Sequence, residues 1–267
     1  MVLTSILLLL VLGLAVGFFA GLLGIGGGAI MVPALTAFFL WQNHDPVWIV
    51  HMALATSMSC IVFNAILSVR THQKHHAVLW PVVSTITPAI LLGSALATLF
   101  VIKLESKVIA LIFMVLMVLV ALQLLLGFKP KATAAKQIPK IELMPAGFII
   151  GFVSAIIAIG GGSLTVPYLT WHQIHIRKAI ATAAAISLPL ALASTLVFMA
   201  KGIKQTGLPE LTLGYVYWPA TILISTGSLF TTSLGAQLTH RLPVHYLKKI
   251  FAAVIVLLAL KMYFSFN

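Results

Sequence analysis

The chain has 267 residues, of which 61% are hydrophobic and 7% are charged, and its formal net charge is +12. This apolar surface is too large for one soluble core, and several apolar runs reach the roughly 20 residues that cross a bilayer, so a soluble globular fold is excluded. The basic residues lie in short loops where they face lipid headgroups rather than a nucleic acid, and a single cysteine, Cys60, excludes an internal disulfide and a cysteine metal cluster.

Apolar stretches follow one another along the chain, at 4–41, 47–69, 78–102, 107–127, 145–171, 179–200, 212–239 and 245–264. They predict an all-α polytopic membrane protein. No Lys or Arg precedes Arg70, so the first stretch lacks the basic region of a signal peptide and is expected to stay as structure. A polar linker, 128–143, separates a first membrane repeat, 1–127, from a second, 144–267.

The stretch GLLGIGGGAIMVPAL, 21–35, contains residues that an ordinary spanning helix avoids. Gly costs about 1 kcal/mol and Pro about 3 kcal/mol relative to Ala in a helix interior. We therefore expect a broken or re-entrant hairpin, whose unpaired backbone groups are tolerated only where they face protein or water. The Val-Pro pair is expected in the first turn of a new half-helix, whose N-terminal N–H groups would bind an anion.

The two halves are internal repeats. The segments that match are 17–35 with 151–169, which align without gaps, 53–57 (ALATS) with 179–183 (AIATA), and Trp80-Pro81 with Trp218-Pro219. The match includes the costly Gly triplets and the Val-Pro pairs. Interrupted segments at corresponding positions of two halves are typical of transporters and mark their binding site.

The distribution of the 16 Lys and Arg residues predicts the orientation. If each Gly-rich element returns to the side from which it enters, one side holds eleven basic residues and the other holds five: Lys103, Lys107, Lys201, Lys204 and Lys261. The alternative, in which each element crosses once, gives no bias. The positive-inside rule therefore predicts two inverted repeats, each with a Gly-rich hairpin followed by three transmembrane helices, a cytoplasmic linker, and both termini on the periplasmic or extracellular side.

The acidic residues indicate the sign of the substrate. All four fall in loops: Asp45, Glu105, Glu142 and Glu210. Cation and proton paths inside membranes usually contain Asp or Glu, so their absence from the apolar stretches favours a small anion. We expect it to bind at the Gly triplets, nearby hydroxyls and two entrance cations: Gly26, Gly27, Gly28, Gly160, Gly161, Gly162, Ser163, Thr56, Ser57, Thr182, His51 and Arg177.

Several of these elements together resemble the TauE/SafE family of sulfite and organosulfonate permeases. They are the paired GLLGIGGGAIMVPAL and AIIAIGGGSLTVPYL segments, ALATS and AIATA, the basic loop SVRTHQKHHAVLWP and the closing GAQLTHRLPVHYLKKIFA. The resemblance implies a bacterial inner-membrane permease for sulfite, a sulfonate or a similar anion, without enzymatic activity, cofactor or metal. Ala183 replaces an expected serine and Ala29 an expected polar residue, which predicts two unequal half-sites.

We expect alternating-access efflux with the substrate between the two Gly-rich hairpins, and other interpretations of the motifs have less support. Gly24-x-Gly26 followed by Asp45 imitates a dinucleotide fingerprint but lies in a membrane segment, and Ser163 near His172 or His175 lacks the acidic partner of a hydrolase. The histidines in 72–76 have no spacing that defines a metal site. A non-transporting membrane enzyme or assembly factor, a cation carrier, and a proton-coupled anion importer that uses His51 stay open, as does homo-oligomerisation.

Overall fold

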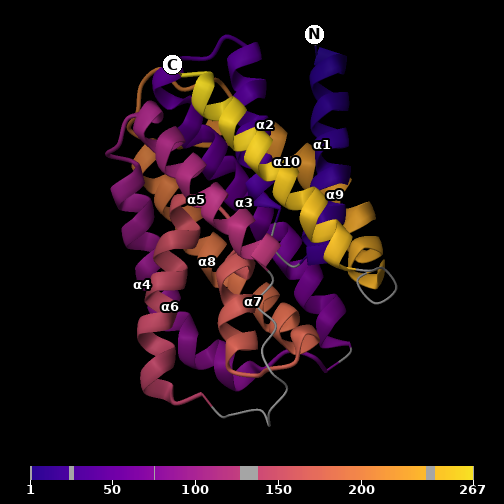
Figure 1. Ribbon diagram of the computed structural model, residues 1–267. Coiled ribbons are helices and arrows are strands. Elements are labelled where there is room, and N and C mark those ends of the chain that lie inside the picture. Colours follow the sequence, from indigo (N-terminus) through magenta and orange to yellow (C-terminus); the bar gives the residue numbers. More distant parts are fainter. Residues whose placement is uncertain (1, 24–26, 75, 127–137, 239–243, 267) are drawn as a thin grey trace.

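Long apolar runs form helices throughout the residues that this computed structural model describes, 2–23, 27–74, 76–126, 138–238 and 244–266 (Figure 1). The first half contains α1 (Val2–Leu23), α2 (Gly28–Trp41), α3 (Pro46–Gln73), α4 (Trp80–Val101) and α5 (Ser106–Leu126). The second contains α6 (Lys140–Ile156), α7 (Gly162–Trp171), α8 (Ile176–Gly202), α9 (Trp218–Leu238) and α10 (Val244–Phe264). Five of the described helices are long and apolar enough to cross a membrane, which confirms the helical polytopic class.

Two segments differ from the expected boundaries. The start of the apolar stretch 212–239 forms an antiparallel β-hairpin, β1 (Thr212–Leu213) and β2 (Val216–Tyr217), and α9 begins only at Trp218. Pro219 favours this start because its missing N–H needs no partner in a first helical turn. Of the linker, 128–137 lies outside the described residues, and the helix α6 already begins at Lys140.

Each Gly-rich element reverses the direction of the chain. Gln42, after α2, donates from Nε2 to Ser5 Oγ of α1 at 3.4 Å, so the end of α2 lies beside the start of α1. His172, after α7, lies 3.4 Å from Glu142 in the first turn of α6. Glu142 was expected in a loop, but a carboxylate in a first turn is favoured by the helix dipole. Both α1–α2 and α6–α7 are therefore hairpins.

A left-handed glycine begins the second helix of each hairpin. Gly27 precedes α2 with φ 76°, and Gly161 precedes α7 with φ 70°, a region that glycine enters without a steric cost. The expectation that Val-Pro lies in the first turn is wrong, because Pro33 and Pro167 are each the sixth residue of their helix. There a proline removes one intrahelical hydrogen bond and leaves a carbonyl of the preceding turn without its donor.

Equivalent residues of the two halves make equivalent contacts. α1 packs along α9 and α6 along α4, and in both pairs a Gly-x-x-x-Gly sequence brings the helix backbones into contact. The matching contacts are Gly13 with Ile224 and Gly147 with Ile86, and Gly17 with Ser228 and Gly151 with Ile90. Each hairpin thus packs against a helix of the other half.

The helices α3 and α8 cross at the centre and run antiparallel. Leu79, shortly after α3, donates its N–H to Thr182 near the start of α8, at 3.0 Å. Tyr217, in the β-hairpin that follows α8, donates its N–H to Thr56 in the first half of α3, at 3.1 Å. Both chain termini lie at the same end of the molecule (Figure 1). The two helix breaks lie beside the central helices α3 and α8.

Candidate functional site

The two helix breaks meet at the centre of the molecule. Gly28, the first residue of α2, lies so close to the carbonyl of Ala158, shortly after α6, that a Cβ at position 28 would collide with it. A Cβ at Gly161 would lie 3.8 Å from Ser187 Oγ and 3.8 Å from Thr165 Oγ1. The expected triplets are therefore adjacent, with Gly160 and Gly162 buried beside Gly161, while Gly26 lies outside the described residues.

Both half-helices present free N-termini at this junction. The first N–H groups of a helix have no intrahelical acceptor, and no side chain caps α2 or α7. In α7 the N-terminus is accompanied by two buried hydroxyls, Ser163 Oγ and Thr165 Oγ1, which have no hydrogen-bond partner among the described residues. Ala29 and Met31 hold the corresponding positions in α2, so the two half-sites are unequal in their polar side chains.

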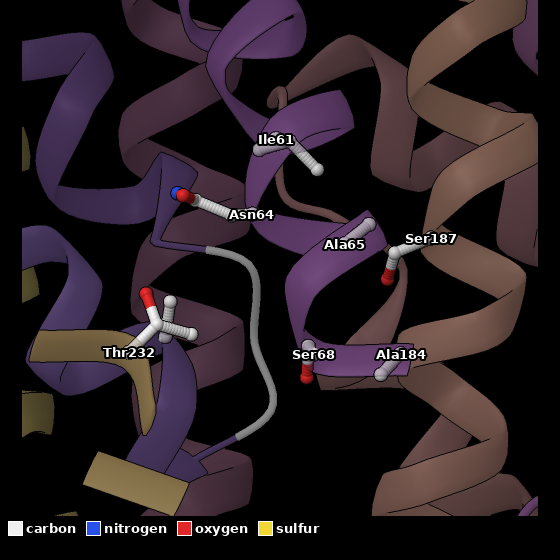
Figure 2. Close-up of a pocket in the computed structure, with 8 residues that line it drawn as sticks. Ile61, Asn64, Ala65, Ser68, Ala184, Ser187 and Thr232 are labelled. Atoms are coloured by element: carbon white, nitrogen blue, oxygen red, sulfur yellow. The ribbon is translucent and has the colours of Figure 1, made fainter. Parts of the chain in front are cut away.

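A small pocket opens beside the breaks (Figure 2). It is bounded by α1, α3, α8 and α9, and its lining residues are Ala20, Ile61, Asn64, Ala65, Ser68, Ala184, Ser187 and Thr232. Those from α3 repeat at helical spacing and so share one face of the helix. Among the described residues, no charged side chain lines the pocket, and the polar groups that line it are hydroxyls and one amide.

Asn64 supplies the hydrogen-bond donor of this pocket. Its Oδ1 accepts a short hydrogen bond from Ser228 Oγ of α9, an interhelical contact that is typical of an amide inside a span. Its Nδ2 is buried and has no partner among the described residues. A buried unpaired donor costs free energy, about 1–3 kcal/mol, that an anion in the pocket would recover.

The hydroxyls of the two repeated Ala-Thr motifs have other partners. Thr56 and Thr182 are fully buried, and each accepts the N–H of the residue that precedes a Trp-Pro helix start, Tyr217 and Leu79 respectively. Their side chains thus satisfy backbone groups at the starts of α9 and α4. Ser57 is buried and its Oγ has no partner among the described residues, one helical turn before Ile61 on α3.

His51 and Arg177 lie far from the breaks and far from each other. Each is ten residues before a pocket residue, Ile61 on α3 and Ser187 on α8, which is about 15 Å along a helix. Because α3 and α8 are antiparallel, the two side chains lie toward opposite ends of the molecule. Arg177 is exposed in the first turn of α8, and the structure does not bring either residue into the pocket.

The ring of His51 is buried under the turn of the β-hairpin. It stacks on Tyr215 with ring centroids 5.6 Å apart and meets the edge of Trp48 at 5.5 Å. Tyr215 is fully buried and also packs against Phe198 of α8. Burial raises the pKa of Tyr215, so this phenol is neutral and adds no charge to the cluster.

Sequence reasoning missed Asn64, Ser68, Ser187 and Thr232 as pocket residues. One signal was available: the ungapped alignment of ALATS with AIATA, continued along both helices, pairs Ile61 with Ser187. These two equivalent residues line the same pocket, as expected at a point where two repeats meet.

Comparison with known proteins identifies the family. The family description "Sulfite exporter TauE/SafE" matches residues 9–262. The chain belongs to the TauE/SafE family. This TauE/SafE chain is 35% identical over 260 residues to a "Probable membrane transporter protein" of Haemophilus influenzae, covering 97% of this chain and 98% of that one.

More distant relatives of this TauE/SafE protein carry similar names. One is "Probable membrane transporter protein MJ0441" of Methanocaldococcus jannaschii, 23% identical, with 96% of this chain and 94% of that one covered. Another is "Probable membrane transporter protein YunE" of Bacillus subtilis, 26% identical, with 98% of each chain covered. No solved structure matches the chain. These matches support a membrane transporter of the TauE/SafE family.

Proposed function

We propose that this TauE/SafE protein is a permease for a small sulfur-containing anion, sulfite or a short sulfonate, in the bacterial inner membrane. The observation that carries the proposal is the pocket beside the helix breaks, whose described lining residues include Asn64, with an unpartnered Nδ2, and no acidic side chain. The half-helix N-termini add N–H groups and the positive ends of helix dipoles. The family's printed name, a sulfite exporter, agrees with this chemistry.

The mechanism that we propose is alternating access by two inverted repeats. Equivalent contacts, such as Gly17 with Ser228 and Gly151 with Ile90, support a twofold relation between the halves. The pocket lies on the second half of α3, whose end carries Arg70 and Lys74, so it faces the side to which the basic residues are assigned. The structure would then be an inward-facing form.

The orientation is tested by labelling single cysteines in a Cys60→Ala background. A cysteine within 128–137 should be protected from an impermeant thiol reagent in intact cells, because the eleven-to-five distribution of basic residues places the linker in the cytoplasm. A cysteine added after Asn267 should react. Permeabilised cells provide the control, in which both cysteines should react. The reverse pattern in intact cells would contradict the inverted-repeat arrangement.

Transport and its site are tested by counterflow in proteoliposomes with sulfite, sulfate, thiosulfate and methanesulfonate. We expect exchange of sulfite or the sulfonate, and a loss of at least about tenfold in Asn64→Leu, which removes the amide donor and keeps the same branching of heavy atoms. Leucine is also the residue at the equivalent position of the second repeat, Leu190. The matched control is Ser228→Ala, which removes the Asn64–Ser228 hydrogen bond but keeps Nδ2.

The outcome separates the site from helix packing. If Ser228→Ala and Asn64→Leu reduce exchange equally, then the amide acts through the contact between α3 and α9 rather than on the anion. If no anion exchanges in the unmodified protein, the permease proposal fails, and a membrane enzyme or assembly factor is favoured instead. Sulfate exchange without sulfite exchange would contradict the proposed substrate but support the proposed transport function.

A further inference from the structure

The repeat relation assigns a counterpart to every residue of the pocket. The three alignments of the repeats pair Ala20 with Ser154, Asn64 with Leu190, Ser68 with Ser194 and Thr232 with Ser94. Ile61 and Ser187 are equivalent to each other, and both line the pocket. The packing registers agree with this pairing, because α1 meets α9 and α6 meets α4 through equivalent residues. The counterpart region therefore lies on the other side of the Ile61–Ser187 centre.

This counterpart region is closed but polar. Ser94, Ser154 and Ser194 are each 0% exposed, and Leu190 and Met58 are fully buried with them. The hydroxyls of Ser154 and Ser194 have no hydrogen-bond partner among the described residues. Buried hydroxyls normally have a hydrogen-bond partner. Two unpaired hydroxyls at the positions that correspond to residues of the open pocket therefore indicate a region that is hydrated or occupied in another state.

An aromatic cluster closes the end of this region. Phe198 lies one turn after Ser194 on α8, and Tyr215 packs on it with ring centroids 6.2 Å apart. Tyr215 also donates its N–H to the Phe198 carbonyl and stacks on His51. At the opposite end, the repeat equivalents of Tyr215, Phe198 and His51 are Ala77, His72 and Arg177. The repeat equivalents of this aromatic cluster thus include neither a Tyr nor a Phe.

We propose that Ser94, Ser154 and Ser194 line a second access cavity, closed in this structure, and that Tyr215 is its gate. The cavity takes the same small oxyanion, held by hydroxyl donors, between the Ile61–Ser187 centre and the end of the molecule covered by the β-hairpin. This inference rests on the proposed transport function and names its second pathway. Opening requires Tyr215 to leave Phe198 and His51.

The test measures the reaction of Ser194→Cys, in a Cys60→Ala background, with a small charged thiol reagent applied to right-side-out vesicles. We expect little reaction while Tyr215 is present and at least a tenfold faster reaction after Tyr215→Ala. The matched control is Ser68→Cys, the pocket equivalent, measured in inside-out vesicles, where it should react from the cytoplasmic side at a rate that Tyr215→Ala does not change. In a second arm with Tyr215 intact, methanesulfonate on both sides of the membrane should accelerate the Ser194→Cys reaction several-fold.

The second arm decides the matter if Tyr215→Ala does not fold. A Ser194→Cys that stays unreactive during measurable methanesulfonate exchange, while Ser68→Cys reacts, overturns the second cavity and leaves the permease proposal standing. Reaction of Ser194→Cys after Tyr215→Ala, in a protein that exchanges no anion, supports the cavity and overturns the transport function on its own.

Discussion

Gly161→Val should reduce sulfite exchange at least about a hundredfold while most of the protein still folds. The atom nearest to a Cβ at this position is Leu190 Cδ1, at 3.4 Å, which is an ordinary van der Waals contact. The neighbouring backbone therefore need not move. The branched side chain would instead occupy the space between Ser187, Thr165 and the N-terminus of α7. The left-handed φ of 70° adds a strain of about 1–2 kcal/mol, which a stable fold can absorb.

Gly207→Val is the control for that strain. Gly207 also has a left-handed backbone, with φ 84°, and its surroundings are open, with Asp45 and Trp48 atoms no closer than 3.9 Å. It follows α8 and lies far along the chain from both helix breaks, so exchange per folded molecule should stay near that of the unmodified protein. If both variants lose exchange activity equally, and only in proportion to the loss of folded protein, then position 161 matters through backbone strain and not through contact with the anion.

Methanesulfonate should distribute across proteoliposomes according to the imposed membrane potential. A single charge gains about 2.3 kcal/mol per 100 mV, which corresponds to a gradient of about 50-fold, and reversing the potential should reverse it. The reason is that Glu142 is the one acidic residue inside the described helices, and it lies exposed in the first turn of α6 rather than along a proton path. Methanesulfonate is suitable because its charge does not change near neutral pH.

The same experiment tests the proton-coupled alternative through His51. Its buried ring has no hydrogen-bond partner among the described residues, but it stacks on Tyr215 well away from the pocket. We therefore expect His51→Gln to keep the response to potential. Uptake that ignores the potential, follows a pH gradient and disappears in His51→Gln would contradict uniport and establish proton-coupled import. An inside-negative cell with the uniport would favour efflux.

The helix breaks and the duplication could be predicted from the sequence because they are local. Three glycines before Val-Pro disfavour a continuous helix wherever they occur, and their recurrence at 160–162 shows that the break is repeated. The absence of acids from the apolar stretches was equally visible. What local patterns could not show is that Pro33 and Pro167 lie inside the half-helices, since the helix starts at the left-handed glycine instead.

Only the tertiary structure decided which polar residues face the pocket. Thr182 and Leu79 are 103 positions apart, and the hydrogen bond between them, like that of Thr56 with Tyr217, follows from the crossing of α3 and α8. The crossing also separates His51 from Arg177 and places Asn64 and Ser187 at the junction of the breaks. Sequence determines where a helix must break, because propensity acts within a few residues; which hydroxyl is left free depends on the neighbour that packing brings to it.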